Sequence, residues 1–375
     1  MLLELSDSIS NAPPVSLPPL MRARLIDVAA RAGVAPNTAS TILNNRPDSW
    51  ASKETRERVL LAAKELNYRP SKAALGVRLG RFNTIGLVVP DLHNPFYPVL
   101  ADYLDQAVAA HGYDLILEHS RNDLASEQHC FQSILDRQVD GVALIVSDPD
   151  LHRPFLAGLA VNGPPTVALA AKPAVALPVD SVVSDFSKGF AQAIEHLVGL
   201  GHQRFAFLCA LAKGQDDGNR PELFRSLLGA RGIAPEDIAF VRCEHHIASA
   251  RDAFRDLLRQ TKAKRPTALI ALNDLSAIGA MRAAADEKLS VPRDLSVIGV
   301  DNIPLGEYLP VALTTIAQPI KDMVTRTASL LIQRIEGKSA SRPSQTIFPT
   351  ELLVRESTAP CRRSSWARAS ARLLE

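Results

Sequence analysis

The sequence lacks the features of a membrane, secreted or zinc-binding protein. It has no apolar run of membrane-spanning length, and its amino-terminal segment lacks the basic start and continuous apolar core of a signal peptide. The four cysteines are far apart and form no C-x-x-C pair, which predicts reduced thiols and no metal site. These absences favour a cytoplasmic protein with no membrane partner.

Common catalytic and nucleotide-binding motifs are also absent. The chain has no glycine-rich phosphate loop, no H-E-x-x-H and no G-x-S-x-G. A pair of acids in a cleft would fit glycoside hydrolysis, but the cleft of a sugar sensor has the same composition. We therefore predict a protein that is not an enzyme and needs no cofactor.

Charge is unevenly distributed along the 375 residues. Residues 21–81 contain 12 Lys/Arg and 5 Asp/Glu, whereas residues 82–360 contain 26 and 32. A basic module joined to an acidic body is typical of a DNA-binding segment attached to a domain that does not bind DNA. The total of +2 conceals this division.

The basic part contains a pattern of short helices. Residues 25–44 read as two helices joined by a tight turn, with Gly33 suited to the positive φ of the turn and Pro36 to the start of the second helix. A third helix is predicted over residues 52–68. The inward-facing residues are predicted to be Val28, Ala29, Ala32, Ala39, Ile42, Leu43, Val59, Ala63 and Leu66.

The second helix presents short polar side chains that suit the edges of DNA bases. Those expected to face outward are Asn37, Thr38, Ser40 and Thr41. Asn37 is the strongest candidate for a base contact, because its amide can bond adenine with two hydrogen bonds. This predicts a helix-turn-helix unit. A helical hairpin in an unrelated domain is the alternative from these residues alone.

At this point the chain resembles the lactose/galactose-repressor (LacI/GalR) family of bacterial transcription regulators. The resemblance extends to about Thr358. It begins with DVAARAGV (27–34), NTAS (37–40), ILN (42–44), TRERV (55–59) and LNYRPS (66–71). It implies that Pro36, Asn37, Thr38, Ser40, Thr41 and Asn44 lie at the DNA.

The resemblance implies that residues 70–81 form a hinge helix that folds on the operator and wedges an apolar side chain into the minor groove. Val77 stands at the wedge position, where the family usually has leucine, and Arg78 suits a phosphate contact. Gly76 weakens such a helix by about 1 kcal/mol relative to alanine. A flexible tether is the alternative.

From Thr84 onward, short apolar strands alternate with amphipathic helices. This alternation predicts parallel sheets covered by helices on both faces, and the number of units predicts two lobes with a cleft between them. The fold class is thus a helical DNA-binding domain followed by two doubly wound α/β lobes, which by the resemblance are like periplasmic binding proteins.

The domain boundaries expected from these patterns divide the chain into five parts. They are a disordered extension at 1–20, the helix-turn-helix domain at 21–69, the hinge at 70–81, an effector-binding core at 82–358 and a basic tail at 359–375. Lobe 1 is expected at about 82–184 and 318–338, and lobe 2 at about 185–317 and 339–358, with a last strand near 345–356. Met21 is an alternative start of translation.

Ligands of doubly wound sheets bind at the carboxyl ends of strands, where this chain places several polar residues. The residues expected at an effector, from strand ends or from the resemblance, are Asp91, Phe96, Ser147, Arg220, His245, Asn273, Asp301 and Gln318. Asp301 could instead be a strand-end turn residue, and Asp274 is favoured as a helix cap over a ligand contact. Ala170, where sugar-binding relatives often have aspartate, puts a simple neutral hexose in doubt.

Together these patterns predict a transcription regulator, most simply a repressor. We expect a homodimer on palindromic operator DNA, controlled by a sugar or sugar acid bound between the lobes. Whether the ligand releases or promotes DNA binding is left open. The alternative is a sugar-binding protein of transport type, against which the DNA-binding module and the missing signal peptide argue.

Overall fold

The computed structural model describes residues 23–44, 51–69, 75–77, 80–146, 148, 150–170, 176–210, 220–261, 264–338 and 342–361. The chain divides into two compact units, Met1–Phe82 and Asn83–Glu375. The predictions for the extension at 1–20, and for nearly all of the basic tail, lie outside the described residues.

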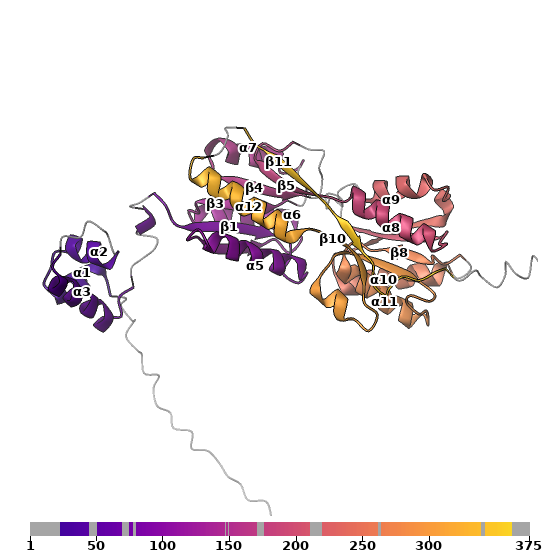
Figure 1. The fold of residues 1–375 in the computed structure, drawn as a ribbon, viewed down its shortest axis with the longest axis horizontal. Coiled ribbons are helices and arrows are strands. Elements are labelled where there is room, and N and C mark those ends of the chain that lie inside the picture. The colour runs from indigo at the N-terminus through magenta and orange to yellow at the C-terminus, as the bar shows by residue number, and fades with distance from the viewer. Residues whose placement is uncertain are drawn as a thin grey trace, which may run out of the picture. The chain divides into compact units, whose positions relative to one another are not determined.

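In the first unit, helices α1 (Leu25–Ala32), α2 (Pro36–Leu43) and α3 (Lys53–Glu65) enclose a small apolar core (Figure 1). Gly33 ends α1 with φ of 64°, a left-handed conformation that glycine adopts without strain, and Pro36 begins α2. The predicted inward residues form this core, with Leu43 and Leu66 only partly buried at its edge.

The second unit is an α/β core whose strands and helices alternate as predicted. Its elements are, in chain order, β1 (Thr84–Val89), α5 (Phe96–Ala109), β2 (Asp114–His119), α6 (Leu124–Asp136), β3 (Gly141–Ile145), α7 (Arg153–Asn162), β4 (Thr166–Ala170), β5 (Asp180–Asp185), α8 (Ser187–Gly199), β6 (Phe205–Ala210), α9 (Arg220–Gly229), η1 (Pro235–Asp237), β7 (Ile238–Cys243), α10 (Ile247–Gln260), β8 (Ala268–Ile270), α11 (Asp274–Asp286), β9 (Ser296–Asp301), η2 (Pro304–Tyr308), β10 (Thr314–Ala317), α12 (Ile320–Ile335), β11 (Gln345–Pro349) and β12 (Glu351–Leu353).

These elements form two lobes, each built on a six-stranded sheet. The lobe 1 sheet has the order β11-β5-β4-β3-β1-β2, and all its pairs are parallel. The lobe 2 sheet has the order β12-β10-β9-β8-β6-β7 and is parallel except for its edge strand β12. The interior strands β1 and β6 are buried along almost their whole length, as expected for sheets that helices cover on both faces.

The chain crosses between the lobes three times: from β5 to α8, from β10 to α12, and from β11 to β12. The last crossing corrects the expected boundary, because residues 345–349 pair with β5 in lobe 1 and only the following strand belongs to lobe 2. Thr350 divides the two strands, and its N–H and hydroxyl both donate to the carbonyl of Asp185. Figure 1 shows these two strands as one yellow ribbon that passes from lobe to lobe.

Two sequence-based predictions concern the whole chain, one about the cysteines and one about membrane-spanning segments. No disulfide joins the four cysteines, and three of them are buried. Among the described residues, no helix is long and apolar enough to cross a membrane.

Candidate functional site

The exposed face of α2 carries most of the side chains predicted to contact DNA. Pro36 and Asn37 are exposed, and Thr38 and Thr41 are partly exposed. The Thr41 hydroxyl donates to the backbone carbonyl of Asn37 at 2.9 Å, so the Thr41 side chain is bonded to the helix itself, and the exposed Asn37 side chain is the better candidate for a base contact. The face therefore offers a hydrogen-bonding side chain to a major groove.

The prediction that Ser40 faces outward is wrong. Ser40 is 8% exposed, because it lies on the side of α2 that also buries Ala39. Asn44 is bonded to it: the Asn44 amide nitrogen donates to the Ser40 carbonyl at 2.7 Å. The spacing of apolar residues in the sequence did not reveal that Ser40 and Asn44 are less exposed than Pro36 and Asn37.

The described part of the hinge contains a contact that the sequence did not reveal. Gly76 is buried against the ring of Phe82, and a Cβ atom at this position would lie 2.4 Å from the Phe82 ring. Val77, the expected wedge, is 70% exposed. Arg78 lies outside the described residues.

A cavity of about 150 Å³ lies between the two lobes of the core. Six of the eight residues expected at an effector line it, namely Phe96, Arg220, His245, Asn273, Asp301 and Gln318. The sequence missed other lining residues, notably Asn94, Tyr97, Asn122, Ser184, Phe186 and Met323. Asn94 and Tyr97 could have been found, because they follow a predicted strand end, whereas Ser184 lies one residue before the end of β5, a strand that the sequence did not predict.

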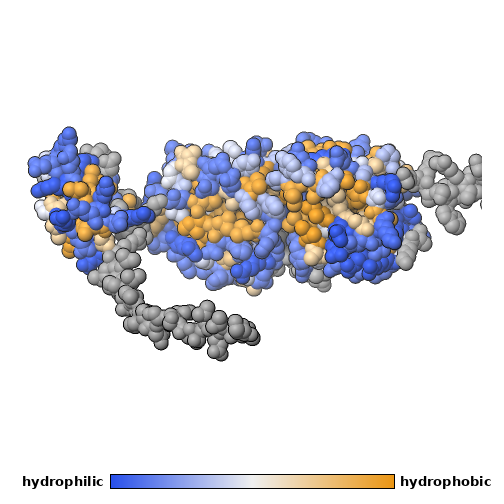
Figure 2. Space-filling model, turned by 90° about the horizontal axis from the view of Figure 1, so that it is seen from below, coloured by the Kyte–Doolittle hydropathy of each residue, from blue (hydrophilic) through white to orange (hydrophobic). Residues whose placement is uncertain are grey.

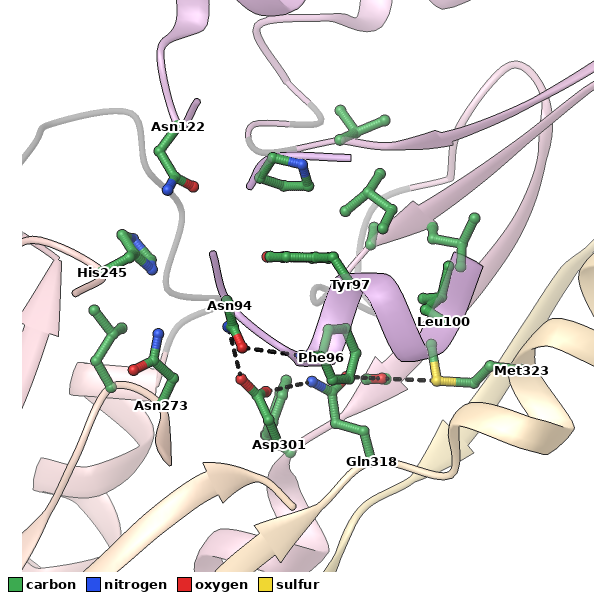
Figure 3. Close-up of a pocket in the computed structure, with 18 of the residues that line it drawn as sticks. Asn94, Phe96, Tyr97, Leu100, Asn122, His245, Asn273, Asp301, Gln318 and Met323 are labelled. Carbon is green, nitrogen blue, oxygen red and sulfur yellow. Dashed lines mark hydrogen bonds between the residues drawn. The ribbon is translucent and has the colours of Figure 1, made fainter. Parts of the chain in front are cut away.

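A chain of hydrogen bonds joins the lobes at the floor of this cavity (Figure 3). The hydroxyl of Ser184 donates to the Gln318 carbonyl oxygen at 2.6 Å, and the Gln318 amide donates to Asp301 at 2.8 Å. The Asn94 amide donates to the other oxygen of Asp301 at 3.3 Å, and Asn94 accepts from the Phe96 backbone. We call these four side chains, Ser184, Gln318, Asp301 and Asn94, the clasp.

Asp301 is held in an unusual conformation at the end of β9. Its φ is 105° and that of Asn302 is 57°, and non-glycine residues rarely take such values except at functional sites and turns. Burial raises the pKa of Asp301 to about 6, although hydrogen bonds from Gln318 and Asn94 lower it in part. The strained backbone and the burial of Asp301 favour a ligand contact over a simple turn residue.

Arg220 supplies positive charge to the cavity. It begins α9 and is 9% exposed. One guanidinium nitrogen donates to the Leu272 carbonyl at 2.9 Å, and the guanidinium lies 5.1 Å from the centre of the Phe186 ring. These contacts orient the group in advance, which lowers the entropic cost of binding an acceptor.

The helix cap at α11 was assigned to the wrong residue. Asn273, expected at the ligand, caps the helix by accepting from the Ser276 backbone at 2.8 Å, and its amide nitrogen is left to donate into the cavity. Asp274, expected to be the cap, is buried instead and accepts from the Thr315 hydroxyl and the Ile303 backbone, both at 2.7 Å.

Two expected effector residues are not seen at the cavity. Asp91 does not line it, because its carboxylate accepts from the His93 backbone at 2.9 Å and orders the turn before α5. Ser147 lies outside the described residues. Among the described residues, no cluster of side chains suits a metal ion.

Family models and known proteins match this arrangement. Residues 24–71 match the model for bacterial regulatory proteins of the lacI family, and residues 194–358 match a periplasmic binding protein-like domain. The HTH-type transcriptional regulator DegA of Bacillus subtilis is 32% identical over 91% of this chain and 99% of its own length. The ribose operon repressor of Halalkalibacterium halodurans is 34% identical over 88% of this chain and 96% of its own.

A solved structure extends the match to three dimensions. The lac repressor dimer bound to operator and the anti-inducer ONPF superposes with a TM-score of 0.76 at 25% identity, over 90% of this chain and 99% of that one. The relatives and the solved structure match this chain over about nine-tenths of its length, which includes both the helix-turn-helix unit and the two-lobed core. The chain therefore belongs to the lacI family of bacterial transcription regulators, which bind DNA through the helix-turn-helix unit.

Proposed function

We propose that this regulator is a dimeric repressor whose affinity for a palindromic operator is set by a sugar or sugar acid in the cavity between the lobes. The observation that carries the proposal is that both lobes line the cavity. Asn94 comes from lobe 1, and Arg220, Asn273 and Asp301 come from lobe 2. An occupant that bonds both walls changes the relative stability of lobe arrangements, which is the requirement for allosteric control.

The chemistry of the wall supports a hydroxylated ligand. A carboxylate, amides and a guanidinium provide both acceptors and donors for sugar hydroxyls, and the rings of Phe96 and Tyr97 provide apolar contact. A relative named as a ribose operon repressor is consistent with this class. We propose that the site binds without catalysis and that the protein acts in the cytoplasm, where bacterial DNA lies.

Dimer formation is supported by the solved dimer on operator and by the surface of the core. On the face shown in Figure 2, apolar areas lie on both lobes with polar surface around them. Large apolar side chains such as Leu305 and Tyr308 are 48% and 81% exposed. Such areas commonly mark contacts between subunits. We assign operator contact to residues 21–69, the hinge to 70–81 and effector binding to the core.

Replacing Asn37 tests the DNA-binding role. Because its amide is exposed on α2, Asn37→Ala should weaken binding to the operator by about 1–3 kcal/mol and leave binding to random DNA nearly unchanged. Operator fragments are first selected from a random duplex library, and both affinities are measured by fluorescence anisotropy at one salt concentration. Equal losses on both DNAs would rule out a base contact by Asn37.

Replacing Arg220 tests the effector role. Arg220→Ala should abolish the response of operator binding to the effector while operator affinity without effector is retained, because Arg220 lines the cavity and not the DNA-binding unit. Arg225→Ala is a matched control, since Arg225 lies on the same helix, packs over the ring of Phe240 and does not line the cavity. Equal effector affinity in the two variants would contradict the assignment of Arg220.

A further inference from the structure

The wall of the effector cavity has two chemically different sides. From this we infer that the effector is a monosaccharide with one deoxygenated edge, such as a sugar with a methyl group in place of its hydroxymethyl group. The inference rests on the proposed effector role of the cavity and narrows the class of ligand. Lobe 2 supplies Arg220, His245, Asn273 and Asp301 to the polar side, and lobe 1 adds Asn94 and Asn122. The apolar side comes from lobe 1.

The apolar side is formed at the ends of β3 and β4 and by the helices α5 and α12. The described residues of this side are Leu100, Ile145, Val146, Leu169, Ala170 and Met323. Five of them are less than 10% exposed, and Ile145 is partly buried. The backbone here is also paired, since the Val146 N–H donates to the Leu169 carbonyl at 3.1 Å. A methyl group gains from burial on such a wall, whereas a hydroxyl finds no partner among these six described side chains.

The polar groups closest to this side are already bonded to other protein groups. The Ser184 hydroxyl contacts both Gln318 and the sulfur of Met323, and Gln318 uses both ends of its amide within the clasp. Asn94 likewise accepts from Phe96 and donates to Asp301. The single hydroxyl hydrogen of Ser184 is therefore used within the protein and is not available to a ligand hydroxyl on this side.

Tyr97 separates the two sides. Figure 3 shows its ring between Leu100 and Met323 on one side and His245 and Asn273 on the other, with the hydroxyl end directed to the polar side. Its ring packs edge-on against Phe96, with centroids 5.2 Å apart. Burial raises the pKa of Tyr97, so its hydroxyl stays a neutral hydrogen-bonding group.

The polar side suits neighbouring hydroxyls of one sugar ring. Each carboxylate oxygen of Asp301 accepts one bond within the clasp and keeps a second lone pair. The Asn273 amide and the Arg220 guanidinium are donors on the same side. The volume of about 150 Å³ is below the ~300–1,000 Å³ of sites for drug-sized ligands, which favours one ring over a disaccharide.

Matched pairs of sugars test the inference on the full-length wild-type protein. Isothermal titration calorimetry is run with D-galactose, D-glucose, L-mannose and D-ribose, each beside its terminally deoxygenated partner. We expect the deoxy member of the best-binding pair to bind at least about tenfold more tightly. Parent sugars that bind equally or more tightly would overturn the inference and leave the proposed sugar effector intact. No binding by any of the eight would overturn the inference, while the sugar acids of the proposed effector class would remain.

A variant of the apolar side provides the second arm. Ala170→Asp places a carboxylate at the end of β4, within the apolar wall, and should reduce the preference for the deoxy sugar by about tenfold or reverse it. Ala170→Leu has similar bulk without polarity and should weaken both sugars alike. An unchanged preference in Ala170→Asp, with operator binding showing that the variant folds, would contradict the inference. The wild-type pairs decide the question if the variant does not fold.

Discussion

At the scale of single residues, the most unusual feature of the core is a pair of buried carboxyl groups in lobe 2. Burial is the largest cause that raises the pKa of Asp274 to about 8, and the charge of Asp301 adds to it. Burial raises the pKa of Asp301 itself to about 6. Asp301 is the last residue of β9, and Asp274 accepts from the backbone of Ile303 just after it, so the turn after β9 is built around two carboxyl groups that resist ionisation.

The raised pKa values predict how stability depends on pH. A carboxyl group with a higher pKa in the folded than in the unfolded chain binds its proton preferentially in the folded state, so the free energy of unfolding falls as pH rises. For Asp274 the fall extends from about pH 4 to about pH 8, by up to about 1.4 kcal/mol per pH unit. Asp274→Asn should remove most of this dependence between about pH 7 and pH 8, where Asp301 is largely ionised. Urea denaturation across this range measures it.

Two comparisons make the pH experiment specific. His196 and His202 have pKa values lowered by burial and act in the opposite direction, so the difference between wild type and variant isolates Asp274. Asp286→Asn is the control, because hydrogen bonds and ion pairs, above all with Arg251, lower the pKa of Asp286 and confine its effect to acidic pH. A wild-type slope that persists in Asp274→Asn would show that another group causes it.

At the scale of elements, helix α8 packs closely against the crossings between the lobes. A Cβ atom at Gly189 would lie 2.5 Å from both the Ile316 side chain and the Thr350 hydroxyl. Thr350 is fully buried and bonded to Asp185, so it has little room to move. At the end of the same helix, a Cβ at Gly199 would meet nothing within 4 Å.

Alanine at these two glycines should therefore have opposite effects. Gly189→Ala should lower the free energy of unfolding by about 1–3 kcal/mol, because overpacking must displace the crossing strands. Gly199→Ala should raise it by up to about 1 kcal/mol through helix propensity alone. Chemical denaturation of both variants measures the difference, and stabilisation by Gly189→Ala would show that the crossing is more deformable than its packing suggests.

Elements with strong local patterns were predictable from the sequence, and those defined by distant partners were not. Alternation of apolar strands and amphipathic helices predicted the parallel sheets of both lobes. The division of residues 345–353 into two strands depends on Asp185, more than 160 positions away in the chain, so no local pattern reveals it. The cap on α11 was misassigned because Asn273 and Asp274 are equally suited to it, and the distant partners Thr315 and Ile303 hold the Asp274 side chain inward.

At the scale of the whole molecule, the separation of charge predicts that the two binding events respond differently to salt. The amino-terminal part carries 12 Lys/Arg against 5 Asp/Glu, whereas the core carries 26 against 32. DNA binding by Lys and Arg releases counterions, so the logarithm of operator affinity should fall with the logarithm of KCl concentration with a slope of about −5 or steeper.

The effector cavity should respond weakly to salt, because Arg220 and Asp301 lie buried in it and are shielded from the solution. Effector affinity should change by less than about twofold between roughly 50 and 200 mM KCl, the range over which operator affinity falls by orders of magnitude. Anisotropy titrations with operator and calorimetry with effector measure both on the same full-length protein. A shallow operator slope would mean that few phosphates are contacted. A steep effector slope would mean that the ligand is bound mainly through exposed charge, and therefore not at the clasp.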